Sequence, residues 1–395
     1  MENLNSLISR EEQDFFHTYK RLSMVIERGE GCYLYTDRGE KILDMFGGLA
    51  VNVLGYNHPR LNAAIKDQIK KYIHVSNFFY QEKQIALAEM ILRLTGFSKV
   101  FFSNSGTEST EAAIKLIRKY FTGTNKKKLV SFSGSFHGRT MGALSLTSRK
   151  KYREQYAPLL DGVAHLEFNS IKDLEKNIND NTAGIFIECI QGEGGVNFAS
   201  QEFINKINEL KRKFDFIIVA DEIQSGIGRT GKMHGFGHFA LDADIVLLAK
   251  GIGGGLPLGA VLGSSRVENV FTYGDHGSTF GGNPVAAACG LVVFEELQNG
   301  MLKNNAELGE YLMNSLRDIQ DLNPERITDV RGKGLMIGIE LGFPGQIVVE
   351  KLISEGALVN CTNNNVIRLL PPYIITKKDI DIFSEKFKRV ISAEP

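Results

Sequence analysis

The chain has 395 residues, with 46 Lys and Arg against 46 Asp and Glu, so its formal net charge is zero; 43% of the residues are hydrophobic and 23% are charged. This composition is typical of a soluble globular protein, and the zero net charge gives no support to a nucleic acid or an anionic membrane as partner. At this length we expect two domains, or one large domain with a smaller one beside it.

The cysteines and the N-terminus indicate the compartment. The four cysteines lie far apart and form no CxxC pair, which is typical of reduced thiols; they are Cys32, Cys189, Cys289 and Cys361. The N-terminal stretch is polar and lacks the apolar core of a signal peptide, and no window approaches the about 18 apolar residues of a membrane span. We therefore expect a cytoplasmic protein.

The predicted elements, taken in chain order, begin with a short helix in the first 50 residues and two strands about the turn Asp37-Arg38-Gly39. A helical apolar stripe covers 81–94. Strands and helices then alternate: strands are predicted at 100–102, 129–132, 183–188, 216–220, 245–249 and 260–262, and helices at 107–120 and 201–213. Apolar strands joined by helical crossovers predict a largely parallel sheet buried on both faces, with ligands at the carboxyl ends of its strands.

The pattern changes after about residue 295. Charged amphipathic helices are predicted at 303–319 and 377–392, and short strands at 334–341 and 366–369. We therefore expect three segments: 1–50 joins a small α+β domain, 51–295 forms the large domain, and 296–395 forms the rest of the small domain. No repeats or low-complexity tracts occur.

Two strand ends carry charged residues that are costly to bury. Lys250 follows 245–249 and precedes a glycine-rich run; a desolvated lysine there has a lowered pKa and is a candidate Schiff-base former. Asp221 ends 216–220 and needs a positive partner, which a protonated pyridine nitrogen could supply. Taken alone, Lys250 is more simply a lysine extending to solvent, and Asp221 is equally a capping or salt-bridging residue.

Other strand ends carry polar and aromatic residues. The run 103–108 opens a helix, so its backbone N–H groups and hydroxyls could bind a phosphate, or simply cap the helix. Phe136 could support an aromatic ligand and Arg139 could clamp a carboxylate, although a core ring and a surface charge are the simpler alternatives. The glycine-lined loop 189–195 carries the carboxylate Glu193, and a further loop, 274–284, adds hydroxyls.

Two patterns suggest other functions and are rejected. Gly226–Gly231 matches G-x-G-x-x-G, but it does not lie directly between a strand and a helix as a dinucleotide fingerprint must. His234 and His238 lack a helix that would direct both at one zinc ion, so we expect no metal site. No G-x-S-x-G signature of a serine hydrolase occurs either.

The ordered motifs S-G-T, F-H-G-R-T, D-E-I-Q, L-A-K-G-I-G-G-G-L-P-L-G-A and G-S-T-F-G-G-N-P together resemble the class III pyridoxal-phosphate aminotransferases of fold type I. The resemblance extends from G-C-Y-L-Y near residue 31 to I-R-L-L-P-P at residue 367. It implies a large domain with a mostly parallel, seven-stranded sheet and a small α+β domain formed by both termini. It also implies a homodimer with shared active sites.

The resemblance assigns a role to each motif. Lys250 would bind pyridoxal 5'-phosphate covalently and then move a proton, and Asp221 would pair with the pyridinium nitrogen. Phe136 would stack on the ring, Gln224 would face its phenolic oxygen, and Thr279 would reach the phosphate from the partner subunit. The cofactor contacts so implied are Ser105, Gly106, Thr107, Phe136, Asp221, Glu222, Ile223, Gln224, Lys250 and Thr279.

Within the family, F-H-G-R-T and E-C-I-Q-G-E-G-G-V look most like acetylornithine aminotransferases. The resemblance then implies ping-pong transfer of the terminal amino group of N2-acetylornithine to 2-oxoglutarate, in arginine biosynthesis. Arg139 and Ser278 would bind the donor, and Arg368 the oxo acid once Glu193 releases it.

Several other activities stay open. Succinylornithine, ornithine, 4-aminobutyrate or a lysine-pathway amine could be the donor. A class III racemase or aminomutase would use the same cofactor without depending on an oxo acid. A nicotinamide-dependent dehydrogenase or a non-enzymatic binding role would leave Lys250 dispensable.

Overall fold

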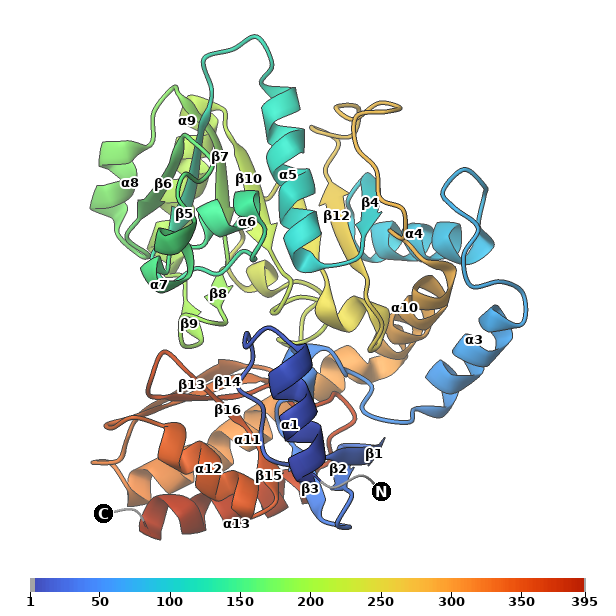
Figure 1. Cartoon of the computed structure of the whole chain (residues 1–395). Helices are drawn as coiled ribbons and strands as arrows, with labels where there is room; N and C mark the ends of the chain where they lie inside the picture. Colours follow the sequence, from blue (N-terminus) through green and yellow to red (C-terminus); the bar gives the residue numbers. More distant parts are fainter. Residues whose placement is uncertain (1–3, 394–395) are drawn as a thin grey trace.

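The computed structural model describes residues 4–393, which form an α/β fold around a seven-stranded sheet (Figure 1). The strand order is β4-β12-β11-β10-β7-β5-β6, and β12 alone runs antiparallel to its neighbours. The strands are β4 (Lys99–Ser103), β5 (Lys128–Phe132), β6 (Val163–Leu166), β7 (Thr182–Ile187), β10 (Ile217–Asp221), β11 (Ile245–Leu248) and β12 (Gly259–Gly263). The predicted mostly parallel sheet is thus confirmed.

Both faces of this sheet are covered, as the uninterrupted apolar strands predicted. Along β10 the side chains alternate, so Ile217 and Val219 pack into one core cluster and Ile218 and Ala220 into the other. Figure 1 shows α5 in front of the sheet. The helices of this region are α3 (Pro59–Ile69), α4 (Glu82–Thr95), α5 (Gly106–Tyr120), α6 (Met141–Leu146), α7 (Lys150–Arg153), α8 (Ile171–Asn177), α9 (Gln201–Phe214) and α10 (Pro284–Glu296).

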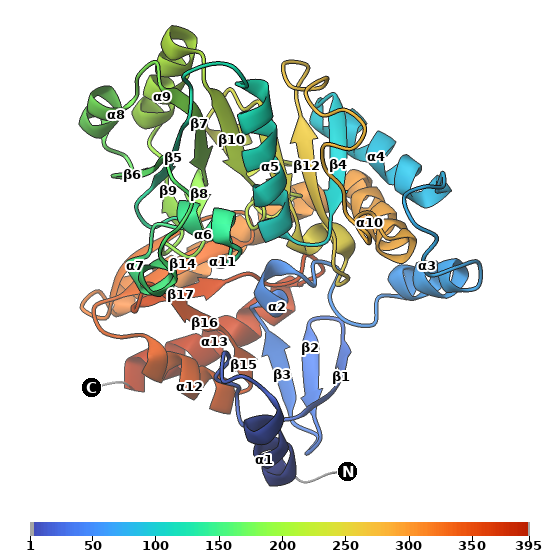
Figure 2. The same cartoon turned by 45° about the horizontal axis from the view of Figure 1, so that its top comes forward.

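The small domain combines segments from the two ends of the chain (Figure 2). Strand β15 (Ala357–Leu358) pairs in parallel with β3 (Lys41–Asp44). Beyond β3, the same sheet contains β2 (Tyr33–Thr36) and then β1 (Ile26–Glu30). A second sheet, in the order β13-β14-β17-β16, comprises β13 (Ile327–Lys333), β14 (Met336–Leu341), β16 (Asn360–Thr362) and β17 (Val366–Leu369). Its helices are α11 (Leu302–Leu322), α12 (Gln346–Ser354) and α13 (Lys377–Ala393). This confirms the predicted α+β unit formed by both termini.

The helical run 284–322 connects the two regions. It comprises α10, a short π-helical turn η4 (Leu297–Met301) and α11, and the predicted boundary near residue 295 falls within it. By length and composition this run could cross a membrane, although no membrane span was predicted from the sequence. However, 56% of its most apolar window is buried, and α10 packs on α3 and α4. It is therefore accounted for as a core helix.

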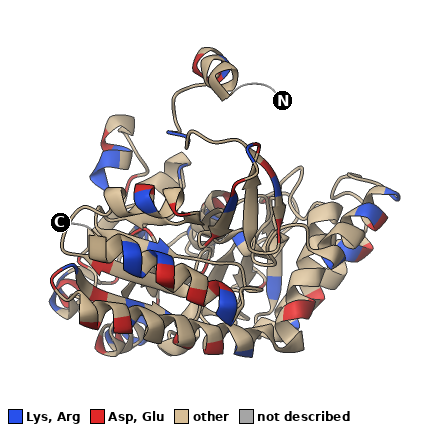
Figure 3. Ribbon diagram, turned by 90° about the horizontal axis from the view of Figure 1, so that it is seen from below, with Lys and Arg blue, Asp and Glu red and all other residues tan. Residues whose placement is uncertain are grey.

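The remaining elements are short. They are α2 (Gly47–Ala50), β8 (Ile190–Gln191), β9 (Asn197–Phe198) and the 3-10 turns η1 (Glu154–Tyr156), η2 (Gly235–His238) and η3 (Lys250–Gly253). The predicted N-terminal helix is α1 (Leu4–Asp14), which has no buried residue and extends away from the body (Figure 3). The first three and last two residues of the predicted terminal segments lie outside the described residues.

Candidate active site

A cavity of about 440 Å³ opens at the carboxyl ends of the central strands, where the polar strand ends were predicted to meet. It brings together ten of the residues singled out in the sequence. These are Ser105, Gly106, Thr107, Phe136, Arg139, Glu193, Asp221, Ile223, Gln224 and Lys250. Residues from five different loops thus form one site, which we call the main cavity.

Lys250 lies at the start of η3, immediately beyond β11, and lines the main cavity. Its φ of 54° is in the left-handed region, which is uncommon for a residue other than glycine and recurs at functional sites. Burial, and then the positive charge of Arg368, lowers the pKa of the Lys250 ammonium to about 8. An appreciable fraction of this amine is therefore neutral and nucleophilic near pH 7, which a lysine extending to solvent would not be.

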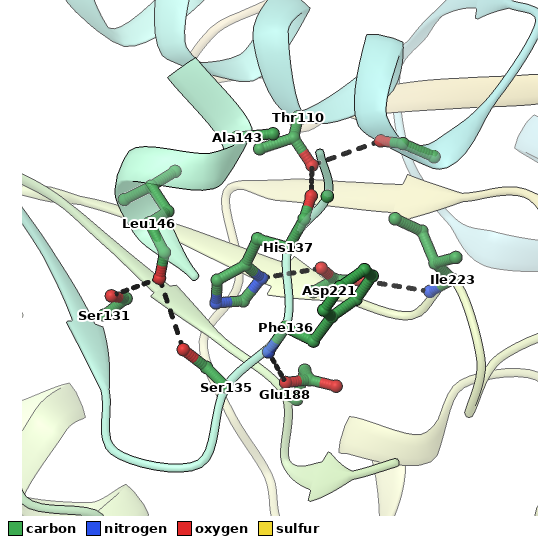
Figure 4. Close-up of polar contacts among 12 residues, drawn as sticks. Thr110, Ser131, Ser135, Phe136, His137, Ala143, Leu146, Glu188, Asp221 and Ile223 are labelled. Carbon is green, nitrogen blue, oxygen red and sulfur yellow. Dashed lines mark hydrogen bonds and ion pairs between the residues drawn. The ribbon is translucent and has the colours of Figure 1, made fainter. Parts of the chain in front are cut away.

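Asp221 is the last residue of β10 and is only 4% exposed. Its Oδ2 accepts a hydrogen bond of 2.7 Å from His137 Nδ1, and its Oδ1 accepts one of 3.1 Å from the Ile223 N–H (Figure 4). The positive partner that its burial required is therefore a histidine of the same chain. Burial alone would lower the pKa of His137, but the hydrogen bond and charge of Asp221 outweigh it and raise that pKa.

His137 is itself held on several sides. Its N–H donates to Thr147 Oγ1 at 2.9 Å, and its carbonyl accepts from Thr110 Oγ1 at 2.8 Å, as Figure 4 shows for Thr110. Sequence reasoning treated His137 only as a family marker, because nothing in the sequence relates it to a residue 84 positions later. The hydrogen bond from His137 therefore fixes the position of the Asp221 carboxylate at the main cavity.

The residues predicted to bind a phosphate lie at the N-terminus of α5 and line the main cavity. Ser105 is the N-cap, and its hydroxyl accepts from the Glu108 N–H at 3.3 Å, so the capping alternative holds for that hydroxyl. Thr107 Oγ1 accepts from the N–H groups of Arg139 and Thr140, both at 3.2 Å. A Cβ at Gly106 would lie 2.6 Å from Ile223 Cδ1, so glycine is required for this close approach.

Phe136 and Arg139 lie in the loop after β5 and line the main cavity. The Phe136 N–H donates to Glu188 Oε2 at 3.0 Å. The Arg139 guanidinium carbon lies 4.0 Å from the centroid of the Tyr152 ring and 5.4 Å from that of Phe136. Arg139 is therefore stacked on an aromatic ring while it lines the main cavity, rather than being an isolated surface charge.

Arg368, on β17 of the small domain, lies directly behind the main cavity and is 1% exposed. Its Nη1 donates to Glu193 Oε1 at 2.7 Å and to Gln224 Oε1 at 3.0 Å, and its Nε donates to Asn360 Oδ1 at 3.2 Å. Burial would raise the pKa of Glu193, but Arg368 outweighs that effect and lowers it. The expected Glu193–Arg368 pair is therefore present, and Gln224 is bound to the same guanidinium.

Arg368 and three other predicted site residues do not line the main cavity. The Glu222 carboxylate accepts from the N–H groups of Gly235 at 2.6 Å and Phe236 at 2.8 Å, so its side chain supports that loop instead. Ser278 and Thr279 line a different cavity, of about 370 Å³, which shares Asn104 with the main cavity. Asn104 Nδ2 donates to Ser278 Oγ at 3.0 Å.

The main cavity also includes residues that were not singled out. Glu188 follows β7, is 7% exposed, and burial raises its pKa to about 7. It could have been found by the argument applied to Asp221, since it too is an acid that ends an apolar strand. The other walls come from Val51, Asn104, His137, Gly138, Ala249, Gly255, Leu256, Pro257 and Leu258, most of which belong to the motifs noted above but were given no individual role.

The two rejected patterns have structural explanations. A Cβ at Gly231 would lie 2.8 Å from Ala306 Cβ, so Gly226–Gly231 permits close packing against α11. His234 stacks on Phe236 at 4.8 Å between ring centroids. Within residues 4–393, no group of three or more His, Cys, Asp or Glu is arranged to hold a metal ion.

Comparison with known proteins gives consistent matches over nearly the whole chain. The family described as Aminotransferase class-III matches residues 15–391. The acetylornithine aminotransferase of Aquifex aeolicus is 45% identical over 92% of this chain and 96% of its own, and that of Archaeoglobus fulgidus is 41% identical over 95% and 97%.

Solved structures agree. The ornithine aminotransferase of Toxoplasma gondii superimposes with a TM-score of 0.94 at 27% identity, covering 100% of this chain and 96% of that one. A second structure of that enzyme, at 28% identity and 99% and 94% coverage, also with a TM-score of 0.94, is described as having partial occupancy of PLP at its active site. A transaminase of the marine bacterium Virgibacillus gives a TM-score of 0.93 at 28% identity, covering 98% of each chain.

Proposed function

The chain belongs to the class III aminotransferases, and we propose that it transfers the terminal amino group of N2-acetylornithine to 2-oxoglutarate, as a step of arginine biosynthesis. The enzyme is a pyridoxal-phosphate-dependent transaminase. The observation that carries the donor assignment is the run of acetylornithine aminotransferases that are 38–45% identical over almost the full length of both chains. The geometry supports it, because Arg139 in the main cavity and the buried Arg368 beside it provide two arginines for two carboxylate-bearing substrates.

The residues of the main cavity fit pyridoxal 5'-phosphate. The N-terminus of the 15-residue helix α5 lines the main cavity and suits a phosphate, because its first N–H groups have no partner within the helix. A neutral Lys250 amine suits the aldehyde, and the Asp221 carboxylate suits a protonated ring nitrogen. When bound, this cofactor supplies an electron-withdrawing ring that stabilises negative charge on the amine-bearing carbon and carries the amino group between donor and acceptor.

The chain's own residues supply proton transfer and orientation. Lys250 Nζ, with its pKa near 8, can accept a proton from the substrate carbon and return it at neutral pH. Asp221, held in place by the hydrogen bond from His137, would pair with the protonated ring nitrogen of the cofactor. The ring of Phe136 lies where it can pack on a flat ligand.

The two arginines separate the two substrates. Arg139 lines the main cavity and would bind the α-carboxylate of the donor through its planar fork. Arg368 is held by Glu193 in this structure, and it would bind the α-carboxylate of the oxo acid once Glu193 turns away. Since donor product leaves before acceptor enters the same cavity, ping-pong kinetics are expected.

We further propose a homodimer in the cytoplasm. Thr279 lies outside its own chain's main cavity, which supports its predicted role toward the cofactor of a partner subunit. The segment Phe78-Phe79-Tyr80 is 94%, 66% and 98% exposed in this chain, and such an aromatic patch favours association. Sedimentation analysis would test the dimer.

A panel of amine donors tests the proposed reaction. The purified enzyme, loaded with pyridoxal phosphate, is mixed with N2-acetylornithine, N2-succinylornithine, ornithine or 4-aminobutyrate, and the loss of the cofactor's absorbance is followed. Acetylornithine should give the highest kcat/KM. A preference for ornithine, the substrate named for the Toxoplasma structures, would overturn the donor assignment but not the family.

A further inference from the structure

A second cavity, of about 510 Å³, adjoins the main cavity and carries a concentration of positive charge. It is lined by Arg149, Lys150, Lys151, Tyr152, Glu193, Cys361, Thr362, Asn363 and Asn364. Glu193 lines both cavities, so they meet at this residue. The rest of its lining comes from α7 and the residue before it in the large domain, and from β16 and the turn that follows it in the small domain. We call this cavity the basic vestibule.

The charge of the basic vestibule is not compensated locally. Among its lining residues Glu193 is the one carboxylate, and that carboxylate is paired with Arg368 on the side of the main cavity. Lys150 and Lys151 are exposed, and within the described residues neither has a carboxylate within salt-bridge distance. In a chain with zero net charge, three adjacent cations therefore produce a local positive potential.

The walls connect this charge to the residues that would bind substrate carboxylates. Tyr152 lies between two cations: Lys151 Nζ is 5.0 Å from its ring centroid and the Arg139 guanidinium carbon is 4.0 Å from it. Asn360, which precedes the lining residue Cys361 on β16, accepts from Arg368 Nε at 3.2 Å. The vestibule thus borders both Arg139 and Arg368.

The boundary between the cavities is itself held in place. The Glu193 carbonyl oxygen accepts from Arg149 Nη2 and, at 2.6 Å, from Thr362 Oγ1. Its main chain is therefore tied to both walls of the vestibule, while its side chain points to Arg368. An anion that accumulates in the vestibule lies beside the residue whose movement would release Arg368.

We propose that the basic vestibule binds small dicarboxylates and delivers the dianionic amino-group acceptor to Arg368. This inference rests on the proposed function, since it concerns the acceptor of that reaction. A cluster of fixed positive charge at the mouth of a cleft raises the local concentration of anions, and the effect grows with ligand charge and falls with ionic strength. It therefore favours a dicarboxylate over a monocarboxylate oxo acid.

The test reverses the two exposed lysines. The variant Lys150→Glu/Lys151→Glu is compared with Lys127→Glu/Lys213→Glu, which makes the same change in net charge at exposed positions beside the amino ends of β5 and β10, the opposite edge of the sheet. Binding of glutarate, a dicarboxylate that cannot react, is measured by calorimetry. The rate is measured with 2-oxoglutarate and with monoanionic pyruvate as acceptors, at low and high ionic strength.

At low ionic strength we expect the vestibule variant to lose about tenfold in glutarate affinity and in kcat/KM for 2-oxoglutarate, and about threefold for pyruvate, a range set by electrostatic enhancement. The loss should shrink to less than about twofold near 0.5 M salt, where the Debye length is short. The control variant should match the wild type. Unchanged glutarate binding, or an equal loss for both acceptors that salt does not alter, would overturn the proposal.

These outcomes are distinct from failure of the proposed function. If the wild type binds glutarate in a lysine-dependent manner but does not use acetylornithine, the donor assignment fails and the vestibule stands. If acetylornithine and 2-oxoglutarate react but charge reversal has no effect, the vestibule fails and the proposed function stands.

Discussion

The Glu193–Arg368 pair permits a quantitative prediction about acceptor binding. In the structure the pair closes at 2.7 Å with Arg368 1% exposed, and the oxo acid must displace Glu193 before it can bind Arg368. Hydrogen bonds to charged groups contribute about 1.5–3 kcal/mol. The change Glu193→Gln removes the charge but leaves an amide oxygen that can still accept, so we expect about half of this to be lost.

Half of that contribution is about 0.75–1.5 kcal/mol, which corresponds to a factor of about 4 to 13. Glu193→Gln should therefore tighten 2-oxoglutarate binding about 4- to 13-fold. It should also lower kcat/KM for the donor, since Arg368 would now compete with Arg139 for the donor carboxylate. Arg368 keeps its hydrogen bonds to Gln224 and Asn360, so its position should persist.

The assay is stopped-flow absorbance of each half-reaction measured separately. The matched control is Glu355→Gln, which removes the carboxylate of a surface pair with Arg389 at 2.9 Å in the small domain. Weaker 2-oxoglutarate binding in Glu193→Gln, or no change in either half-reaction, would refute the idea that Glu193 gates Arg368.

Three further predictions concern the cofactor. Gly106→Ala should weaken pyridoxal phosphate binding at least about tenfold, because the new Cβ would meet Ile223; fluorescence titration measures this, and Gly237→Ala, where the nearest heavy atom is 3.8 Å away, should bind normally. His137→Phe should lower kcat about 100-fold, because it leaves Asp221 without its charged partner. His137→Asn keeps an N–H donor and should retain part of the rate, so equal losses in the two variants would contradict this role. The rate of covalent cofactor attachment to the apoenzyme should rise with pH and level off above about 8, because attachment needs the neutral Lys250 amine; a midpoint near 10.5, the ordinary lysine pKa, would contradict the lowered value.

The core of the site could be predicted from the sequence because the rule that places ligands at the carboxyl ends of parallel strands applies to each strand separately. Each apolar strand could be recognised by itself, and carboxyl ends of parallel strands must share an edge, so Lys250, Asp221 and Phe136 were expected to meet. The antiparallel direction of β12 could not be predicted in this way, because apolar content does not encode strand direction. As a result, the amino end of β12, not its carboxyl end, lies at the site.

Contacts between distant segments could not be predicted from the sequence alone. The hydrogen bond from His137 to Asp221 joins two loops 84 residues apart, and the Glu193–Arg368 pair joins the large and small domains across 175 residues. The second of these was expected only because the motifs resemble a known family. The basic vestibule has no motif at all, because its two walls come from 149–152 and 361–364 and acquire a meaning only when the domains pack together.

The most direct test of the central claim follows the transferred nitrogen. The enzyme is incubated with N2-acetylornithine labelled with ¹⁵N at its terminal amino group and with unlabelled 2-oxoglutarate, and glutamate is analysed by mass spectrometry. We predict stoichiometric ¹⁵N in the glutamate and none with Lys250→Ala. Unlabelled glutamate, or label transfer that persists without Lys250, would contradict the account.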